Sequence, residues 1–241
     1  MRVRVVPPSE FGLACAEEFL AAMRLHRSPF MGLPTGSTPI PMYETLKAFV
    51  ESNRARIDKI YPVAIDEYVG PRDHPASNHS FFKRYWTCLP GAHSVFEFDT
   101  RAIDPVMEAR RMHDLVQTLH GLSTSVLGIG INGHLAFNEP GSPRDATTRL
   151  LDLSHESRTS AQATWGEETP VRGLTLGLDL LLGAARVLLL ANGEAKATII
   201  AAALSGAVTA DIPASYLQEH ADLVVVLDEP AAARLPASLL S

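Results

Sequence analysis

The chain has 241 residues, 46% hydrophobic and 20% charged, which is enough apolar sequence for one large α/β domain with a full core. A net charge of −6 argues against general nucleic-acid binding, so we expect no nucleic-acid partner. Two cysteines give no disulfide framework, and residues 1–8 lack the apolar core of a signal peptide. Together these features predict a cytoplasmic protein.

Apolar runs and apolar periodicity place the elements of the first third of the chain. They predict strands over residues 3–6, 29–33 and 61–65, and helices over residues 9–26, with Ser9 as the N-cap, and 40–50.

A polar loop joins the second of these strands to the second helix, and its residues are Pro34, Thr35, Gly36, Ser37, Thr38 and Pro39. A strand, a Gly/Ser/Thr loop and a helix N-terminus together make a suitable site for an anion such as a phosphate. The loop lacks the lysine of a Walker A sequence, which argues against a nucleoside triphosphate. An ordinary turn before a capped helix is the alternative.

A carboxylate follows the third strand directly, in Asp66-Glu67-Tyr68. In open parallel sheets, ligand-binding and catalytic residues lie at the carboxyl ends of the strands, and a carboxylate there can act as a general base. A helix cap or a solvated turn acid is the alternative. Residues 70–78 are polar and predicted as a loop, and residues 81–86 as an aromatic core helix.

A helix is predicted over residues 104–120, and it carries His113 and His120 two turns apart. Two histidines could be read as metal ligands, but no third ligand has suitable spacing, so a solvated helix face is favoured over a metal site.

The most informative stretch runs from Gly128 to Pro140, after a short apolar strand over residues 125–127. Its glycines permit tight backbone approach, and the loop places one imidazole, His134, five residues before one carboxylate, Glu139. Histidine is the side chain best suited to proton transfer near neutral pH, and a nearby carboxylate can orient it.

The same loop matches the dinucleotide-binding pattern G-x-G-x-x-G at Gly128, Gly130 and Gly133, with Asp152 at a suitable distance for a ribose contact. That fingerprint also needs a helix that begins at the third glycine. Pro140 and the proline at 143 argue against one, so a nicotinamide cofactor is disfavoured.

The remaining elements complete an alternation of strands and helices. They are a strand over residues 150–153, a helix over 157–165, a strand then helix over 174–182, a fully apolar strand over 187–190, an Ala-rich helix after 196 and a strand over 223–227. The longest apolar stretch is interrupted by Asp179 and Arg186, so no membrane partner is expected. Lys196 lies in the first turn of the Ala-rich helix and could face a bound anion; an exposed surface lysine is the alternative.

The alternation predicts an α/β fold: a single doubly wound, mostly parallel sheet with helices on both faces, Rossmann-like, in one domain over residues 1–241.

Four segments that occur in order resemble glucosamine-6-phosphate deaminase, a member of a family related to 6-phosphogluconolactonase. They are Gly32-Leu33-Pro34-Thr35-Gly36-Ser37-Thr38-Pro39, Asp66-Glu67-Tyr68-Val69-Gly70, Gly130 to Pro140, and Gly193-Glu194-Ala195-Lys196. The resemblance implies an enzyme of amino-sugar metabolism that converts glucosamine 6-phosphate and water to fructose 6-phosphate and ammonia. It implies no metal or nucleotide cofactor, and it leaves a monomer or a homo-oligomer open.

The resemblance also implies roles for residues. Asp66 would take the C2 proton, His134 would open the sugar ring with Glu139 tuning it, and Asn132 would assist that step. Thr35, Gly36, Ser37, Thr38 and Lys196 would hold the phosphate.

Two positions depart from the family. Ala163 stands where the family has an arginine that grips the phosphate, which leaves Arg158 or Arg172 as candidates to replace it. Arg149-Leu150-Leu151 replaces the Arg-x-Lys of members with allosteric control, so hyperbolic kinetics are expected. The alternatives are a lactonase of the related family, a deaminase or isomerase of a different amino sugar, and a non-enzymatic sugar-phosphate sensor. The Phe137-Asn138-Glu139-Pro140 continuation favours the deaminase.

Overall fold

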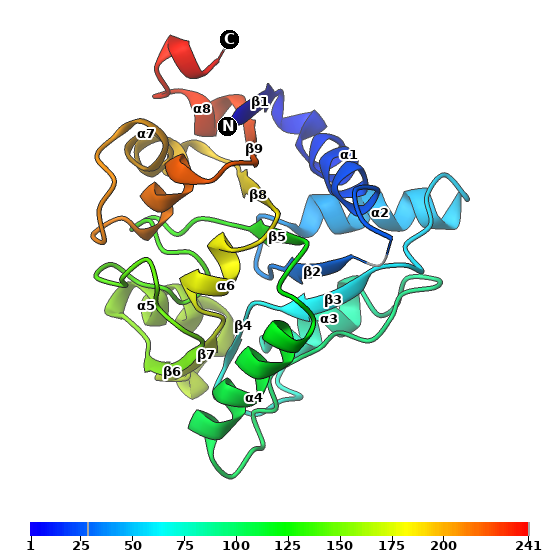
Figure 1. Cartoon of the computed structure of the whole chain (residues 1–241), viewed down its shortest axis with the longest axis vertical. Coiled ribbons are helices and arrows are strands. Elements are labelled where there is room, and N and C mark those ends of the chain that lie inside the picture. The colour runs from blue at the N-terminus through cyan, green and yellow to red at the C-terminus, as the bar shows by residue number, and fades with distance from the viewer. Residues whose placement is uncertain (28, 241) are drawn as a thin grey trace.

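The computed structural model describes residues 1–27 and 29–240 and contains a six-stranded, fully parallel sheet (Figure 1). The strands lie in the order β1-β9-β8-β5-β2-β3. Their bounds are β1 (Arg2–Val6), β2 (Phe30–Leu33), β3 (Tyr61–Ala64), β5 (Thr124–Leu127), β8 (Arg186–Ala191) and β9 (Leu223–Asp228). The expected parallel sheet is therefore confirmed.

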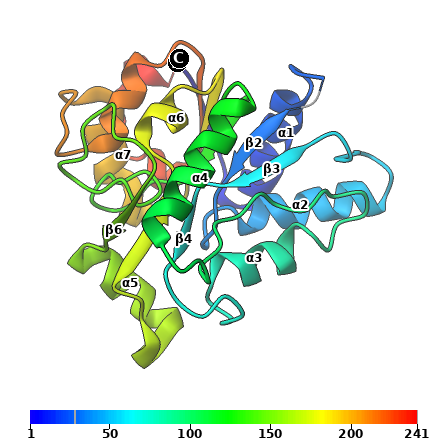
Figure 2. The same ribbon diagram turned by 60° about the horizontal axis from the view of Figure 1, so that its bottom comes forward.

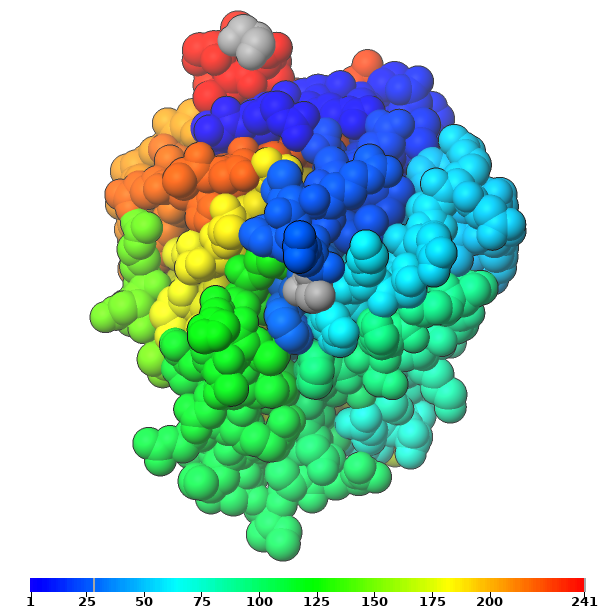
Figure 3. Space-filling model, turned by 45° about the vertical axis from the view of Figure 1, so that its right-hand side comes forward, coloured from blue at the N-terminus to red at the C-terminus, as the bar shows by residue number. Residues whose placement is uncertain are grey.

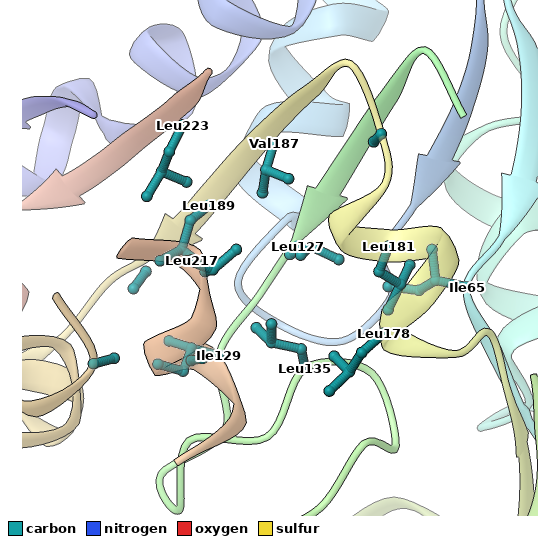
Figure 4. Packing of buried hydrophobic residues seen from close by; sticks show 14 of the residues in the cluster. Ile65, Leu127, Ile129, Leu135, Leu178, Leu181, Val187, Leu189, Leu217 and Leu223 are labelled. Atoms are coloured by element: carbon teal, nitrogen blue, oxygen red, sulfur yellow. The ribbon is translucent and has the colours of Figure 1, made fainter. Parts of the chain in front are cut away.

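The central strands are apolar on both sides because both faces of the sheet are covered. Along β8, Val187 and Leu189 belong to one apolar cluster, whereas Leu188 and Leu190 belong to a second cluster on the opposite face. Figure 4 shows Val187 and Leu189 beside Leu127 of the neighbouring strand. This alternation explains the uninterrupted apolar run that the sequence shows over residues 187–190.

The helices divide between these two faces (Figures 1 and 2). One face packs against α1 (Phe11–Met23), α2 (Ile40–Glu51) and α3 (Asn78–Tyr85). The other packs against α4 (Pro105–Thr118), α6 (Leu178–Leu182), α7 (Ala197–Ser205) and α8 (Glu229–Ala232). In the space-filling view, the N-terminal (blue) and C-terminal (red) residues lie close together at the top of the molecule (Figure 3).

A second sheet, which the sequence did not suggest, has three antiparallel strands in the order β4-β7-β6. Its strands are β4 (Asp66–Tyr68), β7 (Arg172–Thr175) and β6 (Arg149–Asp152), and α5 (His155–Trp165) lies beside β6 (Figure 2). The strand expected over residues 61–65 thus ends at Ala64, and Asp66 starts a strand of another sheet. Asp66 pairs with Thr175 there.

The start of the first helix also differs from the prediction. Ser9 does not cap it, because Pro8–Glu10 form a separate 3-10 turn and α1 begins at Phe11. Asp104, in contrast, caps α4 by accepting hydrogen bonds from the backbone N–H groups of Val106 and Met107.

No helix in the described ranges is both long and apolar enough to cross a membrane.

Candidate active site

A cavity of about 290 Å³ opens at the carboxyl edge of the parallel sheet. Strand order reverses between β2 and β5: the chain continues from β2 outward to β3, but from β5 in the other direction to β8 and β9. Ligands of open α/β sheets bind at such a switch point, where the loops after two neighbouring strands diverge. Here these are residues 34–38 after β2 and residues 128–134 after β5.

Eight of the nine residues selected from the sequence line this cavity. They are Thr35, Gly36, Ser37, Thr38, Asp66, Asn132, His134 and Lys196. The ninth, Glu139, lies behind His134 and contacts its ring. The fold therefore brings four distant segments to one place.

The glycines of the loop after β5 place the imidazole. The N–H of Gly133 donates to the carbonyl of Gly130, and the N–H of Gly130 donates to the carbonyl of His134, both at 3.0 Å. Gly133 has φ +87°, which glycine adopts without strain, and a Cβ on Gly130 would lie 2.3 Å from the His134 ring. No helix begins at Gly133, although the dinucleotide fingerprint needs one there; the glycines instead shape the turn around His134.

The part of this loop that follows His134 is held by buried hydrogen bonds. Asn138 is fully buried and its amide donates to the carbonyls of Leu135 and Leu176, at 3.0 and 2.9 Å. Arg149 donates to Asn138 Oδ1 at 2.8 Å and to Ser142 Oγ at 3.0 Å. The arginine of the Arg149-Leu150-Leu151 segment is therefore part of the support of the loop.

Glu139 is surrounded by groups that favour its ionised form. Its Oε2 lies 3.4 Å from His134 Nδ1 and accepts from Asn132 Nδ2 at 3.0 Å, while Ser157 Oγ donates to Oε1. Burial alone would raise the pKa of Glu139, but His134 and these hydrogen bonds outweigh it and lower the pKa to about 2. Glu139 is thus a carboxylate at neutral pH, and because it faces Nδ1, Nε2 is the ring nitrogen left for a ligand.

Asp66 has the opposite environment. Burial raises its pKa to about 7, although the charge of His134 and a 2.7 Å hydrogen bond from Asn78 Nδ2 to Oδ1 both act to lower it. A carboxyl group with a pKa near neutrality can both accept and release a proton at physiological pH. Side chains alternate along a strand, so Asp66 and Tyr68 line the cavity while Glu67 points away from it.

Glu67 instead supports the neighbouring helix. It is 2% exposed, and it accepts backbone N–H bonds from Asn78 and His79 at 2.9 and 2.8 Å. A carboxylate at a helix N-terminus is stabilised by the helix dipole. Glu67 therefore fixes the start of α3, and with it Asn78, against β4.

The loop after β2 and Lys196 complete the lining of the cavity. Lys196 lies in a 3-10 turn (Glu194–Lys196) that precedes α7, and not in the first turn of that helix. Its Nζ donates to the carbonyl of Ile129 at 2.7 Å, and burial lowers its pKa. The turn is anchored because Asp228 accepts the N–H of Gly193 at 3.0 Å.

Lys196 is the one lysine or arginine among the lining residues that the structure describes. Arg158 and Arg172, the candidates to replace the arginine missing at Ala163, do not line the cavity. Ser160, which lies one helical turn before Ala163 on α5, does.

Several residues of the site were missed from the sequence. Asn78 and Ser157 hold the carboxylates of Asp66 and Glu139, and Phe137 lines the cavity with its ring centroid 5.0 Å from that of Tyr68. A Ser-Asn pair at a helix start is a capping signal that could have drawn attention to Asn78. Nothing in the local sequence indicates the long-range partner of Ser157.

The part of the chain that the structure describes holds no group of three His, Cys, Asp or Glu side chains placed to bind a metal. His113, on α4, lies 3.3 Å from Thr148 Oγ1 and is partly covered by the second sheet, so it does not lie on a solvated face as expected.

Comparison with known proteins supplies the context for this geometry. The family model for glucosamine-6-phosphate isomerases/6-phosphogluconolactonase matches residues 9–226. A glucosamine-6-phosphate deaminase of Exiguobacterium sibiricum is 39% identical over 211 residues, which cover 85% of this chain and 81% of the relative. A solved structure of a monomeric glucosamine-6-phosphate deaminase superposes with a TM-score of 0.93 at 30% identity, covering 97% of this chain and 100% of that one.

The 6-phosphogluconolactonase of Trypanosoma brucei has a TM-score of 0.74 at 20% identity, covering 98% of each chain. At this identity the likeness shows a shared fold only.

Proposed function

Because the chain belongs to the family of glucosamine-6-phosphate isomerases and 6-phosphogluconolactonases, we propose that it is a glucosamine-6-phosphate deaminase. It converts glucosamine 6-phosphate and water to fructose 6-phosphate and ammonia. The observation that carries the proposal is the convergence on one cavity of a near-neutral carboxyl group, an imidazole–carboxylate pair and a buried lysine.

The imidazole–carboxylate pair is suited to opening the sugar ring. This step moves a proton from the C1 hydroxyl to the ring oxygen and breaks the bond between C1 and that oxygen. His134 can carry the proton on Nε2, because Glu139 faces Nδ1 and stabilises the imidazolium. Asn132 joins the pair by donating to Glu139 and accepting the backbone N–H of His134 at 3.2 Å.

Asp66 is suited to the isomerisation. As a carboxylate it takes the proton from C2 of the open aldehyde. A proton is then delivered to C1, and one proton of the amino group passes to O1, which becomes a hydroxyl. The double bond thereby moves to C2, which leaves an imine that water hydrolyses to the ketone and ammonia. A pKa near 7 makes Asp66 an effective base at neutral pH without preventing release of the proton.

The phosphate would be held by Lys196 and by backbone N–H groups of the loop at the N-terminus of α2. Two free cysteines, Cys15 and Cys88, are consistent with work in a reducing cytoplasm.

Ammonia release from glucosamine 6-phosphate tests the proposal, with Asp66→Asn as the matched control. Hydrolysis of 6-phosphogluconolactone is assayed in parallel. Ammonia release by the parent and not by the control supports the deaminase. Lactone hydrolysis without ammonia release would assign the chain to the other branch of its family, and faster release from a different amino sugar would change only the substrate.

A further inference from the structure

Asn78, the first residue of α3, connects Asp66 to the loop after β2. The residue is 4% exposed. Nδ2 donates to Asp66 Oδ1 at 2.7 Å and to the Asp66 backbone carbonyl at 3.0 Å, and Thr35 Oγ1 donates to Asn78 Oδ1 at 2.9 Å. One amide thus contacts both the candidate base and the loop expected to bind the phosphate.

The direction of these hydrogen bonds follows from their chemistry. A backbone carbonyl can only accept, so the NH₂ end of the Asn78 amide must face Asp66 whatever the protonation state of that carboxyl group. The amide oxygen therefore faces Thr35, and because an oxygen of this kind also only accepts, the Thr35 hydroxyl must supply its proton there.

We propose, on the basis of the proposed function, that Asn78 is a positioning residue with two roles. It holds Oδ1 of Asp66 by a hydrogen bond, so that Oδ2 takes the C2 proton. It also accepts the hydroxyl proton of Thr35, so that Thr35 Oγ1 is left to accept a hydrogen bond from the substrate. In this step the proton moves from C2 to Oδ2 of Asp66. Asn78 keeps both of its amide hydrogens and takes no part in the proton transfer. Thr35 then fits a sugar hydroxyl or ammonium group, which can donate, and not a phosphate oxygen.

This assignment changes the expected role of Thr35. The resemblance placed Thr35 among the residues that hold the phosphate, but a fully ionised phosphate monoester has only acceptor oxygens and cannot donate to Thr35 Oγ1. Phosphate contacts from this loop would therefore come from backbone N–H groups and from Ser37 or Thr38, while Thr35 contacts the sugar.

The bond from Asn78 is also a charge-assisted bond to the ionised form of Asp66, so it should act on the titration of that group. The other titratable groups near Asp66 are His134, whose charge lowers its pKa, and Glu67 and Tyr68 on the same strand. Glu139, Glu156 and Lys196 belong to the same site. The facing strand β7 presents Thr175.

The first test measures Asp66 directly, without substrate. The ¹³C resonance of its carboxyl group, assigned by its loss in Asp66→Asn, is titrated in the parent and in Asn78→Leu, which has a similar volume but no donor. Loss of one hydrogen bond to the charged form should raise the pKa of Asp66 by about one to two. The acid limb of the kcat/KM profile should move by the same amount. An unchanged titration would overturn the role of Asn78.

The second test uses Thr35→Val, with Thr35→Ser as the matched control that keeps the hydroxyl. Binding of methyl phosphate, a simple phosphate monoester, is measured at pH 8, where it is dianionic and has acceptor oxygens only. Unchanged phosphate affinity in Thr35→Val, together with a raised KM for the amino sugar, is expected. A roughly tenfold or greater loss of phosphate affinity, restored in Thr35→Ser, would show that the hydroxyl donates to phosphate and would overturn the assignment.

The two proposals fail separately. If the parent releases no ammonia, the proposed function is wrong, yet the titration of Asp66 and the phosphate affinities still decide the direction of the hydrogen bonds. If Asn78→Leu does not fold, the Thr35 pair tests the same chain of bonds from its other end.

Discussion

Asp66 and Glu139 are two carboxylates of one small site, and their surroundings drive their pKa values apart. Burial dominates at Asp66, which has one amide donor, so its pKa rises to about 7. Glu139 is also buried in part, but an imidazole, an amide and a hydroxyl face it, and its pKa falls to about 2. Desolvation prevails at Asp66, whereas the three groups that face Glu139 outweigh it there, and such a separation is how one site can hold both a base and a permanent anion.

The regions that carry the two groups differ in the same way. Asp66 opens a short strand that leaves the parallel sheet, where few backbone or side-chain donors are free to turn toward it. Glu139 lies in an irregular loop that Asn138 and Arg149 stabilise, with the N-terminal turn of α5 behind it. Asp66 therefore keeps one side-chain donor, that of Asn78, whereas Glu139 contacts side chains of its own loop and of the start of α5.

The largest effect should come from removing the base. Asp66→Asn keeps the size of the side chain but cannot take a proton, so turnover should fall by about 10²- to 10⁴-fold. Exchange of the C2 hydrogen with solvent deuterium should vanish as well. Phosphate affinity serves as the control and should be unchanged, while near-normal turnover would remove Asp66 from its role.

The imidazole and its carboxylate should act as one unit. His134→Gln is expected to slow turnover of the cyclic sugar about 10²-fold or more, and adding Glu139→Gln should cost little further. Double-mutant kinetics measure this. Losses that multiply fully would mean that the two residues work independently, contrary to the 3.4 Å contact between them.

The pH profile should report Asp66 and not Glu139. Below a pH of about 7, kcat/KM should fall roughly tenfold per pH unit as Asp66 becomes protonated, and His134→Gln should move that limb upward by removing a charge that lowers the pKa. If the acid limb of the kcat/KM profile keeps its position in His134→Gln, the charge of His134 does not lower the pKa of Asp66, contrary to this prediction.

The contributions of Asp66 and Glu139 to the free energy of unfolding should depend on pH in opposite directions. The raised pKa of Asp66 makes its contribution fullest below its ordinary value of 3.8, and that contribution is lost as pH rises through about 7. The lowered pKa of Glu139 makes its contribution present above 4.5 and lost as pH falls through about 2. Urea unfolding of Asp66→Asn and Glu139→Gln across pH would measure each separately.

The smallest effect concerns the phosphate. Ala163→Arg adds a cation to α5, one turn beyond the lining residue Ser160, and a charge-assisted bond from it should lower the KM for glucosamine 6-phosphate about tenfold or more. Arg158→Ala and Arg172→Ala should leave KM unchanged, because neither side chain lines the cavity. A sharp rise in KM in either variant would show that α5 or β7 moves over the bound substrate.

The sequence alone was enough for the strands of the parallel sheet. An uninterrupted apolar run such as residues 187–190 predicts a strand that is covered on both faces of the sheet, and this pattern can be recognised from the local sequence. The role of the loop after β5 could also be predicted, because the prolines at 140 and 143 argue against the helix that a dinucleotide-binding loop needs. The sequence did not indicate the second sheet, since β4 has three residues and its pairing with β7 depends on a segment more than a hundred residues away.

What the sequence determined by itself is the set of chemical groups: an imidazole and carboxylate in one glycine-rich loop, a carboxylate after a strand, a lysine after a buried strand. Tertiary structure alone decided that these groups face one cavity, because strand order and not chain order sets which loops are neighbours. It also decided the protonation of Asp66 and the partners of Asn78 and Ser157. Burial and hydrogen bonds reach those residues from segments that no local pattern connects to them.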